Sequence, residues 1–374
     1  MHKSKIGCAS TDVKLENFVF YLPRLLTFII FGATTKKTTM RKTITLACAG
    51  ACLLFSAFAC VGNGKKVGNT AKEEKTDIST VSVPQFDADS AYSYISQQVD
   101  FGTRVPNTPG HVACGNYLAQ KLEAFGAKVT SQYADLIAYD GTLLKARNII
   151  GSYKPESKKR IALFAHWDTR PWADNDNDKA NHHTPILGAN DGASGVGALL
   201  EIARQINLQQ PTLGIDIILL DAEDYGTPQF YEGRHLEESW CLGAQYWAKN
   251  PHVQGYNARF GILLDMVGGK NSVFAKEAYS EQFAPDVNKK VWEAAKKLGY
   301  SNLFIDSEIG GITDDHLFIN RLARIKTIDI IGSNPQDGNF VSTWHTVNDT
   351  MEYIDRSTLK AVGQTVLEII YNEK

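Results

Sequence analysis

The stretch from Ile215 to Gly226, IDIILLDAEDYG, constrains the fold of this chain more than any other. Its apolar centre, residues 217–220, is continuous rather than alternating, which is typical of a strand buried on both faces of a sheet. Three carboxylates, Asp221, Glu223 and Asp224, follow at once. Ligand and catalytic groups collect at the carboxyl ends of strands in open α/β sheets, so we expect a site here. Taken alone, the stretch leaves an acidic surface turn as the alternative.

Other boundaries between loops and regular elements carry four more candidate side chains. Two apolar runs end at a histidine and an aspartate, a glycine-rich turn opens an apolar helix, and a polar loop lies near the C-terminus. The side chains at these places are His166, Asp265, Asp191 and His345. Imidazole and carboxylate groups suit zinc, and a site with few thiols and open positions is typical of catalysis rather than of structure. Together with Asp224, they predict a zinc-dependent active site.

The composition is that of an ordinary globular protein. The chain has 374 residues, of which 43% are hydrophobic and 21% charged, and its formal net charge is −2. This length suffices for one large α/β domain with appendages. Because a nearly neutral chain gives no support for nucleic acid as a partner, we expect none.

The N-terminal part of the chain has the pattern of a secretory signal. A basic start at residues 40–42 precedes a short apolar run, 44–59, that ends in mostly small residues. Cys60 comes directly after this run and resembles a bacterial lipoprotein processing site. We therefore expect residues 40–60 to be a lipoprotein-type signal peptide. A single transmembrane anchor is the alternative, but the run is shorter than the about 20 residues that a span needs.

These features define the expected organisation of the chain. Translation from Met40 makes residues 1–39 a non-structural N-terminal extension. The polar, Gly- and Lys-rich residues 61–86 are typical of a flexible linker, and residues 87–374 form a single catalytic zinc domain. We expect an exported bacterial protein on the periplasmic side, anchored to the membrane by lipid and monomeric.

Periodicity predicts strands alternating with helices along the folded domain. Such alternation favours a three-layer α/β sandwich, and the strand pair before the first crossover favours a central mixed, mostly parallel sheet flanked by helices. The domain keeps two cysteines, Cys114 and Cys241, and whether they form a disulfide is left open. The expected strands are 128–136, 143–150, 161–165, 217–220, 260–264 and 325–331, and the expected helices are 90–99, 111–125, 192–206, 239–248, 281–298, 313–320 and 357–371.

Seven motifs, taken in order, resemble the zinc aminopeptidase and glutaminyl cyclase superfamily across the whole folded domain. They are FGTRVPNTPGH (101–111), RNIIG (147–151), AHWDT (165–169), GANDGASG (188–195), DAED (221–224), LLDMVG (263–268) and WHTVND (344–349). The resemblance implies that Asp191, Asp224 and His345 are the ligands of the retained zinc. It also implies an α/β fold of the zinc aminopeptidase type.

The same resemblance implies roles for three further residues. Glu223 takes the place of the general acid and base, and His166 and Asp265 match the ligands of a second metal in two-metal aminopeptidases. In this chain the acidic pair is Glu-Asp, whereas the family's usual pair is Glu-Glu. The shorter Asp224 must therefore approach the metal more closely.

Three features resemble the glutaminyl cyclase branch rather than the peptidases. The run Asp314-Asp315-His316 is similar to an Asp-Asp-His run of the cyclases, whose first aspartate joins a hydrogen-bond chain with Glu223 and Asp265. Trp344 directly precedes His345, as in cyclases, where it lines the substrate pocket. The third is AHWDTRP (165–171), similar to bacterial members of the animal-type cyclases. We expect Trp344 and Trp167 to bind substrate.

This branch implies a glutaminyl-peptide cyclotransferase that acts on peptides or proteins with N-terminal glutamine and contains one zinc. The α-amine of the substrate attacks its own γ-amide carbon, so no water nucleophile is needed. Glu223, Asp265 and Asp314 are the expected catalytic residues, and Glu223 carries the proton from the amine to the departing ammonia. A two-zinc aminopeptidase and a non-catalytic binding lipoprotein are the alternatives.

Overall fold

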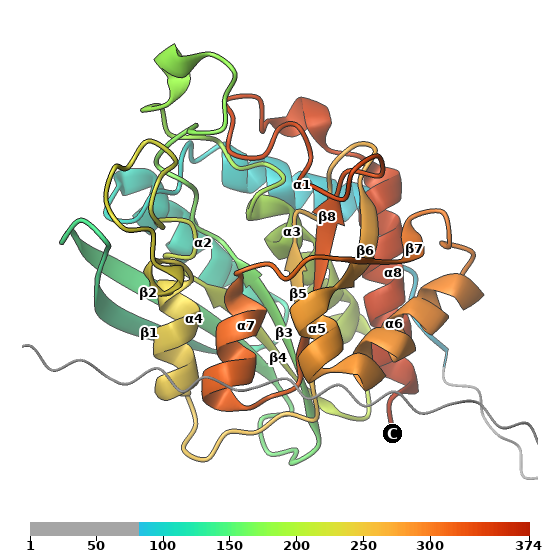
Figure 1. The fold of residues 1–374 in the computed structure, drawn as a ribbon. Helices are drawn as coiled ribbons and strands as arrows, with labels where there is room; N and C mark the ends of the chain where they lie inside the picture. The colour runs from blue at the N-terminus through green and yellow to red at the C-terminus, as the bar shows by residue number, and fades with distance from the viewer. Residues whose placement is uncertain (1–81) are drawn as a thin grey trace, which may run out of the picture. The chain divides into compact units, whose positions relative to one another are not determined.

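The computed structural model describes residues 82–374 (Figure 1). The expected extension 1–39, the signal peptide 40–60 and residues 61–81 of the expected linker lie outside the described residues. Within the part that is described, no helix combines the length and the apolar character needed to cross a membrane.

A mixed sheet of eight strands forms the centre of residues 82–374 (Figure 1). Four of its neighbouring pairs are parallel, β3–β4, β3–β5, β5–β8 and β6–β7. The other three pairs, β1–β2, β2–β4 and β6–β8, are antiparallel. In the order in which they lie in the sheet, the strands are β1 (Lys128–Ile137), β2 (Leu143–Tyr153), β4 (Gly214–Leu220), β3 (Arg160–His166), β5 (Gly261–Asp265), β8 (Thr327–Ser333), β6 (Val273–Glu277) and β7 (Phe304–Ile309).

The four central strands β4, β3, β5 and β8 run parallel and are buried at every residue. Such strands need helices on both faces, because neither face is polar enough to meet water. Along β3, Ile161, Leu163 and Ala165 contact one apolar cluster, whereas Ala162 and Phe164 contact another. Successive side chains of a strand point to opposite faces, so one apolar layer lies on each face of the sheet.

Helices cover the two faces in unequal numbers. The larger apolar cluster joins one face to α1, α2, α3, α6 and α8, and the smaller joins the other face to α4 and α7. The predicted three-layer α/β sandwich with a mixed sheet is thereby confirmed. The helices are α1 (Ala88–Val99), α2 (Pro109–Ala124), α3 (Ala193–Leu208), α4 (Leu242–Lys249), α5 (Ala278–Phe283), α6 (Pro285–Lys297), α7 (Asp315–Phe318) and α8 (Arg356–Asn372).

The structure differs from the predicted elements in three places. The strands β6 and β7 were not predicted, because each is short and β7 is largely exposed with mixed side chains. The predicted helix 281–298 is two helices, since Pro285 begins α6 and Ala284 before it leaves the helical region. The predicted helix 313–320 begins as α7 and continues as a π-helical turn, Ile319–Ala323.

Both cysteines of the domain are buried and free in residues 82–374. Cys114 lies on α2, and Cys241 directly precedes α4 on the opposite face of the sheet. The disulfide that the sequence left open does not form in this structure.

Candidate active site

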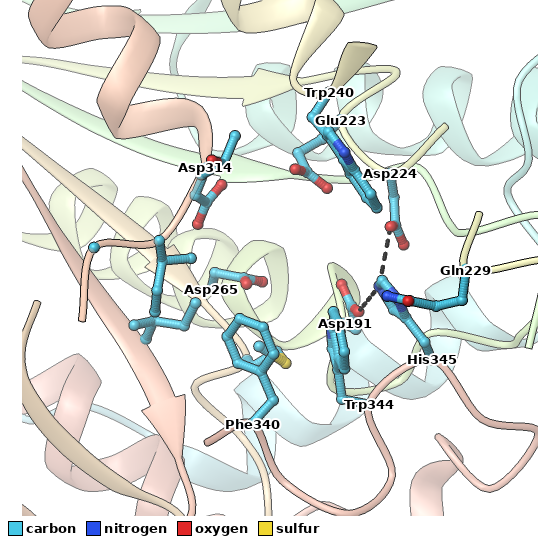
Figure 2. A pocket seen from close by; sticks show the side chains of 15 residues that line it. Asp191, Glu223, Asp224, Gln229, Trp240, Asp265, Asp314, Phe340, Trp344 and His345 are labelled. Carbon is cyan, nitrogen blue, oxygen red and sulfur yellow. Dashed lines mark ion pairs between the residues drawn. The ribbon is translucent and has the colours of Figure 1, made fainter. Parts of the chain in front are cut away.

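The candidate site lies where the parallel strands end. His166 and Asp265 are the last residues of β3 and β5, and Glu223 and Asp224 follow β4. Adjacent parallel strands bring these ends to one edge of the sheet, which is where open α/β sheets hold their sites. Figure 2 shows the cavity that results.

The acidic turn after β4 is held by a buried carboxylate that sequence reasoning did not single out. Asp168 accepts the backbone N–H of Glu223 at 3.0 Å and that of Asp224 at 3.2 Å, one on each oxygen. Ala222 has a φ of 53°, a left-handed conformation that turns the chain sharply after the strand. Both acidic side chains consequently line the same cavity.

Asp191 is positioned in a similar way by Asp349. The backbone N–H groups of Asn190 and Asp191 donate to the two oxygens of Asp349, at 2.8 and 3.0 Å. Gly192 has a φ of 54°, and a Cβ there would lie 2.7 Å from the His166 ring. The loop can therefore come this close to the histidine only with glycine at this position.

One group of three side chains has the composition of a zinc site. Ligand atoms of Asp191, Asp224 and His345 all lie within 4.8 Å of one another, and the three are buried. His345 Nε2 lies 3.2 Å from Asp224 Oδ1 and 3.5 Å from Asp191 Oδ2 (Figure 2). The other Asp224 oxygen, Oδ2, has no hydrogen-bond partner among the described residues.

The protonation of this group fits a divalent cation. Burial lowers the pKa of His345 to about 3, so its imidazole is neutral and offers a lone pair. Burial, followed by the negative charge of Asp191, raises the pKa of Asp224 well above its usual range. Two buried carboxyl groups beside a neutral imidazole provide the oxygen and nitrogen donors that zinc prefers, and a bound zinc ion would relieve the repulsion between the two acids.

A second group consists of His166, Asp191 and Asp265, whose ligand atoms also lie within 4.8 Å of one another. A single atom, His166 Nε2, lies 3.0 Å from Asp191 Oδ1 and 3.2 Å from Asp265 Oδ1. Burial opposes a charge on His166, but the nearby carboxylates of Asp168, Asp191 and Asp265 raise its pKa well above the usual value. In this geometry His166 bridges two carboxylates as a hydrogen-bond donor.

Glu223 lies beside the first group, on the cavity wall. The thiol of Cys241 donates to Glu223 Oε1 at 3.1 Å, and Glu223 Oε2 lies 4.0 Å from His166 Nδ1. Burial raises the pKa of Glu223 well above its usual range, and the nearby charges of Asp224 and Asp314 raise it further. A raised pKa of this kind is what a carboxyl group needs in order to serve as both acid and base.

Asp265 and Asp314 line the same cavity as Glu223. Burial raises the pKa of Asp265 to about 7, although its hydrogen bond to His166 lowers it. Asp314 begins α7 by accepting the N–H of Asp315, and its Oδ2 has no hydrogen-bond partner within residues 82–374. The hydrogen bond of Asp265 runs to His166 rather than to Asp314, so the expected chain of hydrogen bonds is interrupted there.

Aromatic side chains form the rest of the cavity, which has a volume of about 310 Å³. Trp344 stacks on His345 with ring centroids 3.8 Å apart, and Trp240 lies parallel to the same imidazole at 6.2 Å. Phe340 stands next to Trp344 on the cavity wall (Figure 2). Trp344 thus lines the cavity, and its role in binding substrate stays a prediction.

Trp167 is a correction to the sequence analysis, which expected it to bind substrate. Its side chain is fully buried, stacks on His111 and donates its indole N–H to the carbonyl of Arg147 at 3.1 Å. It does not line the cavity. Successive side chains of an extended chain point in opposite directions, so the Trp167 side chain points away from the side that His166 faces.

Several residues of the site were missed as functional side chains. Arg170 forms a buried ion pair with Asp174, whose Oδ1 lies 3.6 Å from His345 Nδ1, so the pair orients the imidazole. Asp168 and Asp349 belong to the motifs AHWDT and WHTVND, and this membership was the only indication in the sequence that they have a role in the site. Trp240 and Phe340 come from irregular loops, and no sequence pattern indicated that they line the site.

Comparison with known proteins places this geometry in a family. The sequence matches the model of Peptidase family M28 over residues 148–370, which is more than half of the chain. The chain belongs to peptidase family M28. The resemblance identified from the seven motifs is confirmed.

The solved structures similar to this chain include both glutaminyl cyclases and aminopeptidases. A Bacteroides thetaiotaomicron glutaminyl cyclase, solved with bound N-acetylhistamine, is 81% identical, with a TM-score of 0.78 over 78% of this chain and 100% of that one. A leucine aminopeptidase precursor from Bacteroides thetaiotaomicron VPI-5482 is 80% identical, with a TM-score of 0.76 over 79% of this chain and 100% of that one. Glutaminyl-peptide cyclotransferase from Bos taurus is 24% identical over 308 residues, 72% of this chain and 78% of that protein.

The role of Asp168 gives a first prediction. Asp168→Ala removes the acceptor of two buried N–H groups and should lower the free energy of unfolding by about 2–4 kcal/mol, because hydrogen bonds to charged groups are the stronger kind. It should also weaken zinc binding, since the turn that carries Asp224 loosens. Denaturant unfolding of zinc-free protein and zinc competition with a chelator measure the two effects.

Asp140→Ala is the matched control. Asp140 also accepts a backbone N–H, that of Thr142 at 2.9 Å, but in an exposed turn away from the cavity. Its loss should change stability by no more than about 1 kcal/mol and should leave zinc affinity as it is. Equal effects of the two substitutions would contradict the role assigned to Asp168.

Proposed function

We propose that this chain is a zinc-dependent glutaminyl-peptide cyclotransferase, which converts the N-terminal glutamine of peptides and proteins to pyroglutamate and releases ammonia. One observation carries the proposal. A complete set of zinc ligands, Asp191, Asp224 and His345, stands next to a buried Glu223 in one cavity. The 81% identity to a bacterial glutaminyl cyclase over the whole length of that chain supports the same reaction here.

The residues that hold the metal are all present and fit it. Zinc bound by Asp191, Asp224 and His345 supplies a Lewis acid for the γ-carbonyl oxygen of the glutamine. The ion pair of Arg170 and Asp174 lies beside His345, with Asp174 Oδ1 3.6 Å from Nδ1, and Trp344 stacks on the imidazole.

Glu223 carries the proton. During cyclisation a bond forms between the α-nitrogen and the γ-carbon of glutamine, and the bond from that carbon to the amide nitrogen breaks. The α-nitrogen loses a proton and the departing nitrogen gains one, so a single group that first accepts and then donates balances the reaction. Glu223 is buried beside the zinc ligands, and Cys241 fixes one of its oxygens.

The walls of the cavity favour an intramolecular reaction. Trp240, Phe340 and Trp344 surround a space of about 310 Å³, at the small end of the range for ligand sites. Such a space suits one amino-acid side chain with its amine. Holding the amine against the amide carbon in a narrow cavity favours ring closure over attack by water.

We propose one zinc per chain rather than two. The support is the position of His166, whose Nε2 lies between carboxylates of Asp191 and Asp265 and bonds both. Those two carboxylates and His166 satisfy one another without a second cation. Asp265 and Asp314 then act as acids that set the charge around Glu223, consistent with their place on the cavity wall.

A two-zinc aminopeptidase is the second candidate function. It is favoured by the second group, His166, Asp191 and Asp265, which has the composition of a metal site. The 80% identity to a leucine aminopeptidase precursor favours it as well. In that reaction Glu223 activates a water molecule for attack on the peptide carbonyl.

The N-terminal sequence supports a proposal for where in the cell the reaction takes place. We propose that the chain is exported by the signal at residues 40–60, is lipidated at Cys60 and acts as a membrane-anchored monomer on the periplasmic side. Residues 61–86 would then let the catalytic domain reach the N-termini of other exported peptides and proteins.

The function is tested by comparing two substrates on one preparation. Glutaminyl-β-naphthylamide should be cyclised with release of ammonia, and leucyl-β-naphthylamide should not be cleaved. Elemental analysis of the same sample should give about one zinc per chain. Cleavage of the leucyl substrate together with two tightly held zinc ions would instead establish the aminopeptidase.

Glu223 and Asp224 are adjacent but should give different phenotypes. Glu223→Gln should keep zinc and lower kcat by about 10²–10⁴-fold, because it removes the proton carrier without changing the shape of the site. Asp224→Asn should lower zinc affinity, so added zinc should restore part of its activity. Turnover and zinc content, each measured with and without added zinc, separate the two.

If the Glu223→Gln variant loses zinc and added zinc restores its activity, the roles of the two acids are exchanged. If it cyclises glutamine at a near-normal rate, Glu223 is not the proton carrier. Asp140→Asn, an exposed change of the same kind, is the control for the loss of one carboxylate.

The lipid anchor is tested with Cys60→Ser. The variant should still be exported but should leave the membrane fraction on washing, because it has no thiol to acylate. Cys48→Ser, within the apolar run of the signal, is the matched control and should stay with the membrane. Wild-type protein that is already soluble after export would contradict the anchor and indicate a cleaved signal peptide.

A further inference from the structure

Arg104, in the loop between α1 and α2, is a fully buried cation whose guanidinium bonds only backbone carbonyls. Its Nε donates to one carbonyl at 3.2 Å, its Nη1 to a second at 2.6 Å and its Nη2 to a third at 2.8 Å. The two other buried arginines, Arg160 and Arg170, each form an ion pair with a carboxylate, whereas Arg104 forms none within residues 82–374. The guanidinium therefore acts on the path of the chain rather than on another side chain.

The first of these carbonyls lies in the segment that follows β3. It belongs to Trp167, which directly precedes Asp168. In the same segment, Thr169 Oγ1 accepts the backbone N–H of Arg104 at 2.9 Å. Because Asp168 in turn accepts the backbone N–H of Asp224, this segment connects Arg104 to the acidic turn after β4.

The other two carbonyls lie in the loop that precedes α3. They belong to Leu187 and Gly188, a few residues before Asp191. Gly188 has a φ of 56°, and a Cβ there would lie 3.2 Å from Arg104 Nη2, so the loop approaches the guanidinium closely. A guanidinium is a planar fork of fixed donors, and this one can hold the two segments at one separation.

The position of this charge is linked to the site. Burial lowers the pKa of Arg104, and the negative charges of Asp349, Asp168 and Asp191 oppose that shift. An arginine without a carboxylate in contact is costly to bury in an apolar core, but less so beside a surplus of carboxylates. The location of Arg104 therefore indicates a role in the zinc site as well as in the core.

We propose that Arg104 is a positioning residue of the zinc site, which holds the segment after β3 and the loop before α3 at the separation that lets Asp191 and Asp224 bind one zinc ion. This inference rests on the zinc-dependent function proposed above. Arg104 does not line the cavity and its hydrogen bonds reach no zinc ligand, so it acts through the backbone of the two segments.

Zinc affinity tests this role, because a residue that only supports the fold can lower stability without changing the dissociation constant of zinc. Arg104→Lys keeps the positive charge but not the planar fork. It should raise the zinc dissociation constant by roughly 10-fold, the lower end of the range typical of partners outside the ligand set. Arg104→Met, which also removes the charge, should raise the constant as well. Competition with a chelator measures the constant on protein that circular dichroism shows to be folded.

The sign of the effect separates positioning from charge. Removing a positive charge near the site favours a bound cation when nothing else changes. Tighter zinc binding by Arg104→Met, together with unchanged binding by Arg104→Lys, would mean that Arg104 contributes only its charge. That result would overturn the proposal.

Arg160 provides the comparison at the other end of the same strand. It is also buried and bonds three backbone carbonyls in addition to Asp216, but it begins β3, which ends at His166. Arg160→Lys and Arg160→Met should lower the free energy of unfolding of zinc-free protein, measured in denaturant, and leave the zinc dissociation constant unchanged. If a methionine variant does not fold, the two lysine variants carry the comparison.

An unchanged dissociation constant in Arg104→Lys, or an equal rise in Arg160→Lys, would contradict the role of Arg104. Failure of the proposed function is recognised on the wild-type protein. If that protein binds no zinc, both proposals fall. If it binds zinc but leaves glutaminyl-β-naphthylamide uncyclised, only the reaction is refuted, and the zinc affinities of the variants still decide the role of Arg104.

Discussion

The crowding of buried carboxylates around two histidines is the constraint on which the rest of this structure depends. Asp191, Asp224 and Asp265 are all buried within reach of His166 and His345, and like charges so close cannot all be ionised without a compensating cation. The fold keeps them together by attaching each to a rigid element or a turn, at the ends of β3, β4 and β5 and at the start of α3. Because four parallel strands are buried along their whole length, the sheet supplies the apolar stability that offsets this cost.

Backbone strain is concentrated at the same edge of the sheet. Among the described residues, eight non-glycine residues have a positive φ, and four of them, Ala222, Cys241, Met266 and His345, belong to the site or contact it. Such conformations cost of order 1–3 kcal/mol each and persist only where the surroundings over-determine them. Here the surroundings are specific. Asp168 holds the turn at Ala222, and the backbone N–H of Cys241 donates to the carbonyl of Glu223. The strain is thus part of how the side chain of Glu223 is positioned.

The sequence predicted those parts of the structure whose signals are local. The central strands were visible as continuous apolar runs, and the candidate site as polar residues where loops meet regular elements, because both are local patterns. The strands β6 and β7 were not visible, since β6 pairs with β8 and β7 pairs with β6, in each case across many residues of sequence. The roles of Asp168 and Asp349 as acceptors of backbone N–H groups, and the buried position of Trp167, are likewise decided by tertiary packing. The residue type alone does not predict such a contact.

Cyclase and aminopeptidase chemistry can share this site because both need the same first group of ligands and the same Glu223. What separates them is the state of the second group. A second metal would need His166 Nε2 and Asp265 as ligands, whereas here that nitrogen bonds two carboxylates at once. Each of these bonds must be broken before a second metal can bind, and the histidine must also give up a proton. Proteins of 80% and 81% identity to this chain carry different activity names, so overall similarity does not decide between the reactions. We propose that competition between a proton and a metal for His166 Nε2 does.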